Sequence, residues 1–395
     1  MEKRNIYMDH AATTYVKPEV LEEMIPYFTE NFGNPSSIYS QARVTNMAID
    51  ESRGKIAKAI NADRREIFIT GGGSEADNWA IKGYANANKH KGNHIITTTI
   101  EHHAILHVCE YLGKNGFEIT YLPVDEKGFI NIDDLRNAIK DTTILVSIMF
   151  ANNEIGTIQS VKEIGEVCRE NKVVFHTDAV QAVGHIPVDV QELNIDMLSM
   201  AAHKFYGPKG VGALYVRKGI RLENLIHGGA QERNKRAGTE NIPGIIGMAK
   251  ALELAVENME EENKKLVMLR NKLIDGLLER VPHSRLNGPC GEMRLPGNAN
   301  ITFEFIEGES ILLMLDAKGI AASSGSACTS GSLDPSHVLL AIGLPHEIAH
   351  GSLRLSLGEK TTEEEIDYVL EVVPQIVQRL REMSPLWDNF AKGEK

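Results

Sequence analysis

Short runs of β-branched and apolar residues alternate with longer helical patterns between about residues 65 and 220. Six such runs are predicted to be strands, at residues 67–70, 94–97, 144–148, 173–176, 197–200 and 212–216. Amphipathic segments such as 75–91 and 160–171 separate several of them. Because neighbouring parallel strands need a long connection, usually a helix, this alternation predicts an α/β fold with a largely parallel sheet covered by helices on both faces.

The pattern changes after about residue 285, where strands at 300–303 and 353–356 flank a helix near 308–317 and precede a closing helix at 362–381. Between the two regions, a long charged stretch from about 243 to 280 is predicted to be a surface helix that leaves the first region. A chain of 395 residues is longer than one hydrophobic core usually serves. We therefore expect two domains, the second of them a smaller α/β domain.

Charge and cysteine content exclude several classes of function. The formal net charge of −12 disfavours a direct nucleic-acid surface. Residues 1–14 contain no apolar signal-peptide region, and the longest apolar stretches, such as 144–150, are too short to cross a membrane. We therefore expect a cytoplasmic protein without a membrane partner. None of the four cysteines (Cys109, Cys168, Cys290 and Cys328) belongs to a CxxC pair, so neither a metal site nor a disulfide framework is expected.

Cys328 lies in the segment 323–331, which contains only small side chains and two glycines. Such a segment has little apolar surface with which to anchor itself, so a thiol within it is expected to be accessible. Accessible thiols tend to serve chemistry, whereas buried ones tend to serve packing. The segment alone leaves two interpretations open, a reactive cysteine and an incidental one in a small-residue loop.

A glycine-rich turn follows the first predicted strand of the alternating region. Strand 67–70 runs into Gly71-Gly72-Gly73-Ser74 before a helix, which suits a phosphate, although an ordinary strand–helix turn has the same composition. The turn matches neither the GxxxxGK[ST] nor the GxGxxG pattern, so neither an ATP site nor a dinucleotide site is indicated. The phosphate would belong to another cofactor.

Asp178, Lys204 and His102 each follow another predicted strand, where ligands collect in open α/β sheets. Asp178 could pair with a protonated ring nitrogen or simply cap a turn. Lys204 could present a desolvated nucleophilic amine, with Lys209 as a rival in a more exposed turn. His102 could stack on a flat ring or be structural. A phosphate cradle, histidine, carboxylate and lysine placed in this way together predict a site for pyridoxal 5′-phosphate (PLP).

These features, together with motifs spread over nearly the whole chain, resemble those of the NifS/IscS cysteine desulfurases, class V members of the fold-type I PLP-dependent enzymes. The motifs lie at residues 8–14, 33–37, 152–156, 203–210, 236–239, 323–331 and 384–387. The resemblance implies a large PLP-binding domain at 17–258 with a mostly parallel seven-stranded sheet flanked by helices. It also implies a smaller α/β domain, formed by residues 1–16 and 259–395, that carries the 323–331 cysteine loop.

The resemblance further implies roles for individual residues. Lys204 would bind the cofactor as a Schiff base and move the substrate Cα proton. His102 would stack on the ring and help to deprotonate the substrate thiol, and Cys328 would attack the substrate sulfur. Asp178 would hold the pyridine nitrogen protonated, and Arg354 would pair with the substrate carboxylate. The remaining contacts would come from Gly73, Ser74 and His203 at the phosphate, Asn153 and Gln181 at the ring oxygen, Asn153 also at the substrate, and Thr239 of the second subunit of a homodimer.

Ala201 departs from the pattern of the family that the chain resembles. The family usually has serine at this position, and the serine hydroxyl donates a hydrogen bond to the cofactor phosphate. Alanine has no donor, so the resemblance implies one phosphate contact fewer in this chain.

The implied reaction converts L-cysteine to L-alanine and leaves the sulfur on Cys328 as a persulfide. The sulfur would then pass to an acceptor protein for iron–sulfur cluster, thiolated-tRNA or thiamin synthesis. Three alternatives stay open: a selenocysteine lyase, a class V aminotransferase that does not need Cys328, and a non-enzymatic scaffold that only binds sulfur-acceptor proteins. The joint presence of Lys204, Asp178, His102 and Cys328 favours the desulfurase.

Overall fold

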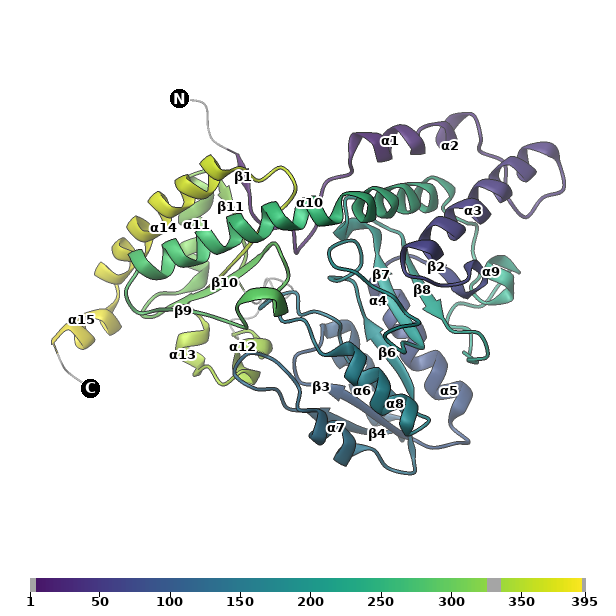
Figure 1. The fold of residues 1–395 in the computed structure, drawn as a ribbon, viewed down its shortest axis with the longest axis horizontal. Coiled ribbons are helices and arrows are strands. Elements are labelled where there is room, and N and C mark those ends of the chain that lie inside the picture. Colours follow the sequence, from purple (N-terminus) through teal and green to yellow (C-terminus); the bar gives the residue numbers. More distant parts are fainter. Residues whose placement is uncertain (1–4, 325–334, 393–395) are drawn as a thin grey trace.

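The computed structural model describes residues 5–324 and 335–392, which form a mixed α/β structure around a large sheet (Figure 1). The sheet has seven strands in the order β2–β8–β7–β6–β5–β3–β4. Their bounds are β2 (Ile67–Thr70), β3 (His94–Thr98), β4 (Glu118–Leu122), β5 (Thr143–Ser147), β6 (Val174–Asp178), β7 (Met197–Ala201) and β8 (Gly212–Val216). β8 runs antiparallel to both of its neighbours, and the other pairs are parallel. The expected seven-stranded, mostly parallel sheet is confirmed.

β4 is the strand of this sheet that no apolar run in the sequence indicated. It lies at the edge of the sheet beside β3, and only Leu122 among its five residues is buried. A half-exposed edge strand lacks the continuous apolar run that identifies strands buried on both faces.

Alternate residues of the central strands point to opposite faces of the sheet and pack in two separate apolar clusters. On one face, Ile96 and Leu198 pack with side chains of α3 (Ser40–Ala59), α8 (Val161–Glu170) and the first half of α10 (Ile242–Arg280). On the other face, Ile95 and Met197 pack with α6 (His103–Lys114) and with the helical stretch α4 (Gly73–Asn78), η2 (Trp79–Gly83) and α5 (Tyr84–Asn88). Helices therefore cover both faces, as the alternation of strands and helices predicts.

α10 is a 39-residue helix whose two halves belong to different apolar clusters. Its first half contributes Ile245 and Leu252 to the cluster against the large sheet, and its second half contributes Leu269 and Leu273 to another cluster. Figure 1 shows the helix running from the large sheet to α14 (Glu363–Glu382). The prediction of a surface helix is wrong for most of this segment, because side chains on both sides of the charged run 260–265 are buried.

The second cluster covers a smaller sheet near the other end of α10. Its three antiparallel strands lie in the order β12 (Ser352–Ser356), β10 (Asn298–Phe303) and β9 (Ser284–Leu286), and α11 (Gly308–Ala317) and α14 contribute to the same cluster. β1 (Ile6–Tyr7) pairs in parallel with β11 (Ile320–Ala321), as Figure 1 shows. Ile6 and Met8 are buried in this cluster. The N-terminal strand therefore packs with the C-terminal part of the chain.

The remaining helices are short. They are α1 (Pro18–Met24), α2 (Pro26–Thr29), α7 (Ile132–Ala138), α9 (Gln231–Asn234), α12 (His337–Ala341), α13 (His346–Ala349) and α15 (Pro385–Lys392), with single turns at η1 (Arg64–Glu66), η3 (Ala202–Lys204) and η4 (Gly291–Met293). Among the residues that the structure describes, no helix, not even α10, is both long and apolar enough to cross a membrane.

Candidate active site

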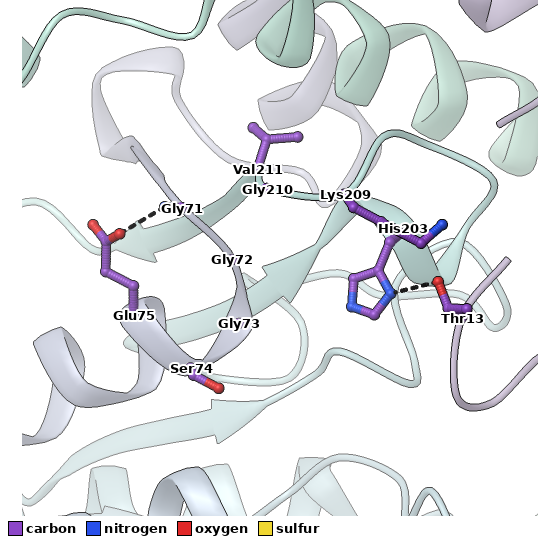
Figure 2. A pocket seen from close by; sticks show the side chains of 10 residues that line it. All are labelled: Thr13, Gly71, Gly72, Gly73, Ser74, Glu75, His203, Lys209, Gly210 and Val211. Atoms are coloured by element: carbon purple, nitrogen blue, oxygen red, sulfur yellow. Dashed lines mark hydrogen bonds between the residues drawn. The ribbon is translucent and has the colours of Figure 1, made fainter. Parts of the chain in front are cut away.

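A pocket of about 530 Å³ opens where the turn after β2 meets the connection between β7 and β8 (Figure 2). The N-terminal segment closes its third side. Its lining residues are Thr13, Gly71, Gly72, Gly73, Ser74, Glu75, His203, Lys209, Gly210 and Val211. Three stretches that are distant in the sequence therefore meet at the carboxyl end of β2 and β7, where the sequence predicts a ligand.

The turn at the bottom of this pocket is built from backbone. Gly72 has a φ of +152°, which L side chains rarely adopt. A Cβ on Gly212 of β8 would lie 2.9 Å from the Cα of Gly72, so the turn packs directly on the neighbouring strand. Gly72 is also the N-cap residue of α4, and a glycine has no side chain with which to satisfy the first amides of the helix. The turn therefore fits an anion such as a phosphate.

Glu75 ties this turn to a second loop through an ion pair. Its Oε2 accepts a hydrogen bond from the Gly71 N–H at 2.8 Å, as Figure 2 shows. Its carboxylate also accepts from Arg236 Nε at 2.9 Å and from Arg236 NH2 at 3.1 Å. The guanidinium offsets the negative charge that Glu75 would otherwise place beside a bound anion. No role for Glu75 is predictable from a sequence motif.

Lys204 lies in the 3-10 turn η3 that follows β7. Its Nζ donates to the carbonyl oxygens of Ala11 at 2.6 Å and Ala12 at 2.8 Å, and Gln181 Nε2 donates to the same Ala11 carbonyl at 3.0 Å. The Lys204 amine is thus held against the N-terminal segment beside Gln181. The rival Lys209 is exposed, and its Nζ donates to the Thr14 carbonyl at 3.1 Å.

His203 lies across the pocket from the glycine turn, and Ala201 lies at the end of β7 beside Gly73. His203 Nδ1 lies 3.1 Å from Thr13 Oγ1 (Figure 2). Burial, reinforced by Lys204 and Lys209, lowers the pKa of His203 to about 4, so its ring is neutral at neutral pH. Ala201 is buried at the end of β7, and a Cβ on Gly73 would lie 3.7 Å from its methyl group. The side chain at position 201 therefore lies next to the glycine turn but provides no hydrogen-bond donor.

Asp178 is the last residue of β6 and is 6% exposed. Its Oδ1 accepts a hydrogen bond from the Val180 N–H at 2.9 Å. Burial raises the pKa of Asp178, and the neighbouring His102 and Lys204 oppose this rise. A protonated ring nitrogen beside this carboxylate would stabilise its charged form.

A buried polar network lies next to Asp178. His176 Nδ1 lies 2.8 Å from Ser147 Oγ, its Nε2 lies 3.0 Å from Ser199 Oγ, and Asp77 Oδ1 lies 3.8 Å from the same Nε2. Burial, with the nearby Asp178, raises the pKa of Asp77 well above its usual range, and burial lowers the pKa of His176 to about 3. Asp77 and His176 are thus favoured in their neutral forms, which leaves Asp178 better able to carry the charge.

His102 and Arg354 complete the set of predicted side chains in this region. His102 is the N-cap residue of α6, where its Nδ1 accepts a hydrogen bond from the Ala104 N–H at 3.1 Å, so a neutral ring carries its proton on Nε2. Arg354 on β12 donates from NH1 to the Asn153 carbonyl at 3.1 Å and from NH2 to Asp9 Oδ1 at 2.9 Å. Asn153 and Arg354 are therefore brought together, with Asp9 as a contact that the sequence did not predict.

Of the predicted residues, Gly73, Ser74 and His203 line this pocket. His102 lines a neighbouring cavity together with Ser74, and Gln181 lines a separate one. Thr239 is exposed and lines none of these cavities. Cys328 lies outside the described residues. Within residues 5–324 and 335–392, no group of three or more His, Cys, Asp or Glu side chains is arranged to hold a metal ion.

The chemistry of the donors fits PLP. The glycine turn and a neutral histidine suit its phosphate, a buried carboxylate suits its ring nitrogen, and an amine suits its carbonyl carbon. Each of these groups is placed by backbone or by buried hydrogen bonds of the chain itself.

Comparison with known proteins shows the family of the chain and several similar proteins. Residues 6–369 match the family described as aminotransferase class-V. A cysteine desulfurase IscS of Clostridium botulinum is 65% identical over 393 residues, which cover 99% of each chain. A solved structure of a NifS-like protein has a TM-score of 0.90 and 40% identity, covering 95% of this chain and 100% of that one. A structure of SspA in complex with cysteine has a TM-score of 0.80 and 38% identity, covering 91% and 100%.

Proposed function

Because this chain belongs to the class-V aminotransferase family and is a PLP-dependent cysteine desulfurase, we propose that it converts L-cysteine to L-alanine by passing the substrate sulfur to Cys328. The observation that supports this proposal most strongly is the meeting of three kinds of group at one site. These are the glycine turn 71–73, the buried carboxylate of Asp178 and the Lys204 amine. Lys204 is close enough to Asp178 to oppose the rise in its pKa. A Cβ on Gly73 would lie 2.8 Å from Val180 Cγ2, and the Val180 N–H donates to Asp178.

Specific residues in and around the pocket would hold the cofactor. Asp178 would bind the ring nitrogen, and His102 would lie against the ring. The phosphate contacts would come from Gly73, Ser74 and His203, and the ring-oxygen contacts from Asn153 and Gln181. When bound, PLP supplies a sink for the electrons of the substrate Cα–H bond.

The side chains of this chain would then move one proton and one sulfur atom. Arg354 would bind the substrate carboxylate, and Lys204 would remove the Cα proton. The Cys328 thiolate would attack the substrate sulfur, forming an S–S bond while the substrate C–S bond breaks. The electron pair of the broken C–S bond stays with the three-carbon fragment, which takes up one proton at Cβ and regains one at Cα from Lys204, so that it leaves as L-alanine and the sulfur stays on Cys328 as a persulfide.

The proposal is tested by supplying L-cysteine as the sole substrate and measuring alanine, sulfide and the mass of the Cys328 peptide. Alanine formation together with a gain of one sulfur atom on Cys328 is the expected result. A turning-over enzyme with no single-sulfur adduct on Cys328 would remove the relay. Turnover that needs an added keto acid and releases no sulfide would instead identify an aminotransferase.

Ala201→Ser is expected to tighten PLP binding. The serine hydroxyl would add one hydrogen bond to a charged phosphate, nominally worth about 1–3 kcal/mol. The measurement is a titration of both apoenzymes with PLP, with thermal unfolding of the two apoenzymes as a control for altered stability. Equal dissociation constants would show that other donors already satisfy the phosphate.

A homodimer is supported by an unusual apolar surface on α1, α2 and the start of α3. The exposed apolar side chains there are Leu21, Ile25, Phe28, Phe32, Ile38, Val44 and Met47, of which Ile38 is 93% and Phe32 67% exposed. Exposed apolar patches of this kind mark interaction sites. We assign this surface to a second copy of the chain, whose Thr239 would reach the cofactor phosphate.

The double variant Phe28→Glu/Phe32→Glu is therefore expected to weaken self-association about 100-fold or more, since each copy would bury two unpaired charges. Light scattering coupled to size-exclusion chromatography measures the change. Met268→Glu, which alters an exposed apolar side chain on the second half of α10, is the matched control. If the double variant keeps the wild-type mass at all concentrations, the dimer surface lies elsewhere.

The remaining assignments follow from this proposal. The sulfur on Cys328 would pass to an iron–sulfur scaffold or another acceptor protein. A cytoplasmic location is supported by Cys109, Cys168 and Cys290, which are free thiols. The division into a large domain at 17–258 and a small one at 1–16 and 259–395 is supported by α10, which changes cluster between Ala255 and Leu266.

A further inference from the structure

Asp9 and Arg354 form an ion pair beside the candidate active site. Asp9 Oδ1 lies 2.9 Å from Arg354 NH2, and the two side chains are 19% and 3% exposed. An arginine buried to this degree needs a counter-charge or several good acceptors, because burial disfavours an unpaired charge. Asp9 supplies that counter-charge within the described chain.

The position of Asp9 is set by backbone contacts with the smaller sheet. Asp9 forms a parallel bridge with Ser356 of β12, and the Ser356 N–H donates to the Met8 carbonyl at 2.8 Å. On the other side of the strand, the Met8 N–H donates to the Ala321 carbonyl at 2.8 Å. The carboxylate therefore projects from a segment held on both sides, and its location relative to β12 is fixed by the fold.

The guanidinium of Arg354 has two of its three nitrogens engaged. NH1 donates to the Asn153 carbonyl and NH2 donates to Asp9. Nε is buried and has no hydrogen-bond partner among the described residues. Two fixed contacts on one planar group set the orientation of the whole plane. The Nε–H is then an unused donor of the guanidinium.

We infer that Asp9 is a positioning residue, which holds the Arg354 guanidinium in the plane that binds the substrate carboxylate. This inference rests on the proposed role of Arg354 as the carboxylate-binding group. With Asp9 in place, the guanidinium is oriented and charge-balanced before the substrate arrives. Without it, Arg354 keeps only the Asn153 contact and must be ordered by the substrate itself, at the expense of substrate binding.

The test compares Asp9→Ala with the more conservative Asp9→Asn in the PLP-loaded enzyme. Asp9→Ala is expected to raise the KM for L-cysteine about tenfold, the effect of losing one charge-assisted contact, while kcat changes less than about twofold. Asp9→Asn keeps an Oδ1 acceptor and should recover a large part of the loss. Asp50→Ala removes the exposed partner of Arg64 and serves as a matched control with an unchanged KM.

Two binding measurements separate positioning from a general structural role. The non-reacting product L-alanine, titrated by its effect on cofactor absorbance, should bind about tenfold more weakly to Asp9→Ala. Cysteamine, which lacks the carboxylate, should bind the wild type and Asp9→Ala equally. An equal loss for both ligands would mean that Asp9 only supports the fold and would overturn the inference, as would unchanged or tighter L-alanine binding.

Arg354→Gln distinguishes failure of this inference from failure of the proposed function. If Arg354→Gln weakens L-alanine binding and Asp9→Ala does not, Arg354 binds the carboxylate without help from Asp9, and only the inference fails. If Arg354→Gln binds L-alanine as the wild type does, the proposed role of Arg354 fails and the inference fails with it. Circular dichroism of each variant confirms that the compared proteins are folded.

Discussion

Replacing Lys204 with alanine is expected to lower L-cysteine turnover by at least about 1,000-fold, because the amine is both the covalent attachment point for the cofactor and the base for the Cα proton. The two candidate lysines have different surroundings. Lys204 Nζ is held inside the site by Ala11 and Ala12, whereas Lys209 is exposed and bonded to Thr14. Turnover is measured as alanine release.

The cofactor content of the same variants gives an independent readout. Lys204→Ala should keep the glycine turn and Asp178, so it is expected to bind PLP non-covalently and to lose it on dialysis. Lys209→Ala should retain PLP in covalent form. Turnover of Lys204→Ala within about tenfold of the wild type would show that another base operates. Covalent attachment lost only in Lys209→Ala would exchange the roles of the two lysines.

Cys328→Ala is expected to lower L-cysteine turnover by at least about 100-fold, since it removes the thiolate that accepts the substrate sulfur. The measurement follows alanine and sulfide from L-cysteine. Cys290→Ala is the matched control, because Cys290 is a free and exposed cysteine outside the pocket. Its turnover should equal that of the wild type.

The outcomes for Cys328→Ala also separate the alternative enzymes. A persulfide-forming desulfurase loses activity toward L-cysteine in this variant. A selenocysteine lyase would keep turnover of L-selenocysteine, and an aminotransferase would keep keto-acid-dependent turnover with L-cysteine. Unchanged sulfide release from L-cysteine would contradict the proposed sulfur transfer to Cys328.

The strands that are buried on both faces could be located from sequence, because burial on both sides requires a continuous apolar run. The runs at 67–70 and 212–216 coincide with β2 and β8, and those for the other buried strands fall within one or two residues of the observed ends. The edge strand β4 escaped notice since its residues are mostly solvent-accessible. The bounds of α10 were predicted correctly, but its burial was not. The charged run 260–265 suggested a surface helix, whereas apolar residues before and after that run are buried.

In the candidate site, residues at strand ends could be predicted from the sequence, whereas contacts between segments far apart in the chain could not. Asp178 and Lys204 stand at strand ends, where position along the chain already suggests a ligand. The groups that hold Lys204 are the backbone carbonyls of Ala11 and Ala12. Because every residue has a backbone carbonyl, no side-chain pattern in the sequence could predict these contacts. No feature of the sequence around Asp9 indicates a partner for its carboxylate. Its ion pair with Arg354 depends on the packing of the N-terminal segment against β12.

The segment from Asp9 to Thr14 has a consequence for the order in which the molecule is assembled. Its Ala11 N–H donates to Ser356 Oγ, 345 positions later in the chain. The strands of the large sheet lie within residues 67–216, whereas the segment that holds Lys204 and pairs with Arg354 packs on β12, at Ser352–Ser356. The cofactor pocket is therefore completed only after β12 has been made and has paired with this segment, so cofactor capture follows formation of the large sheet.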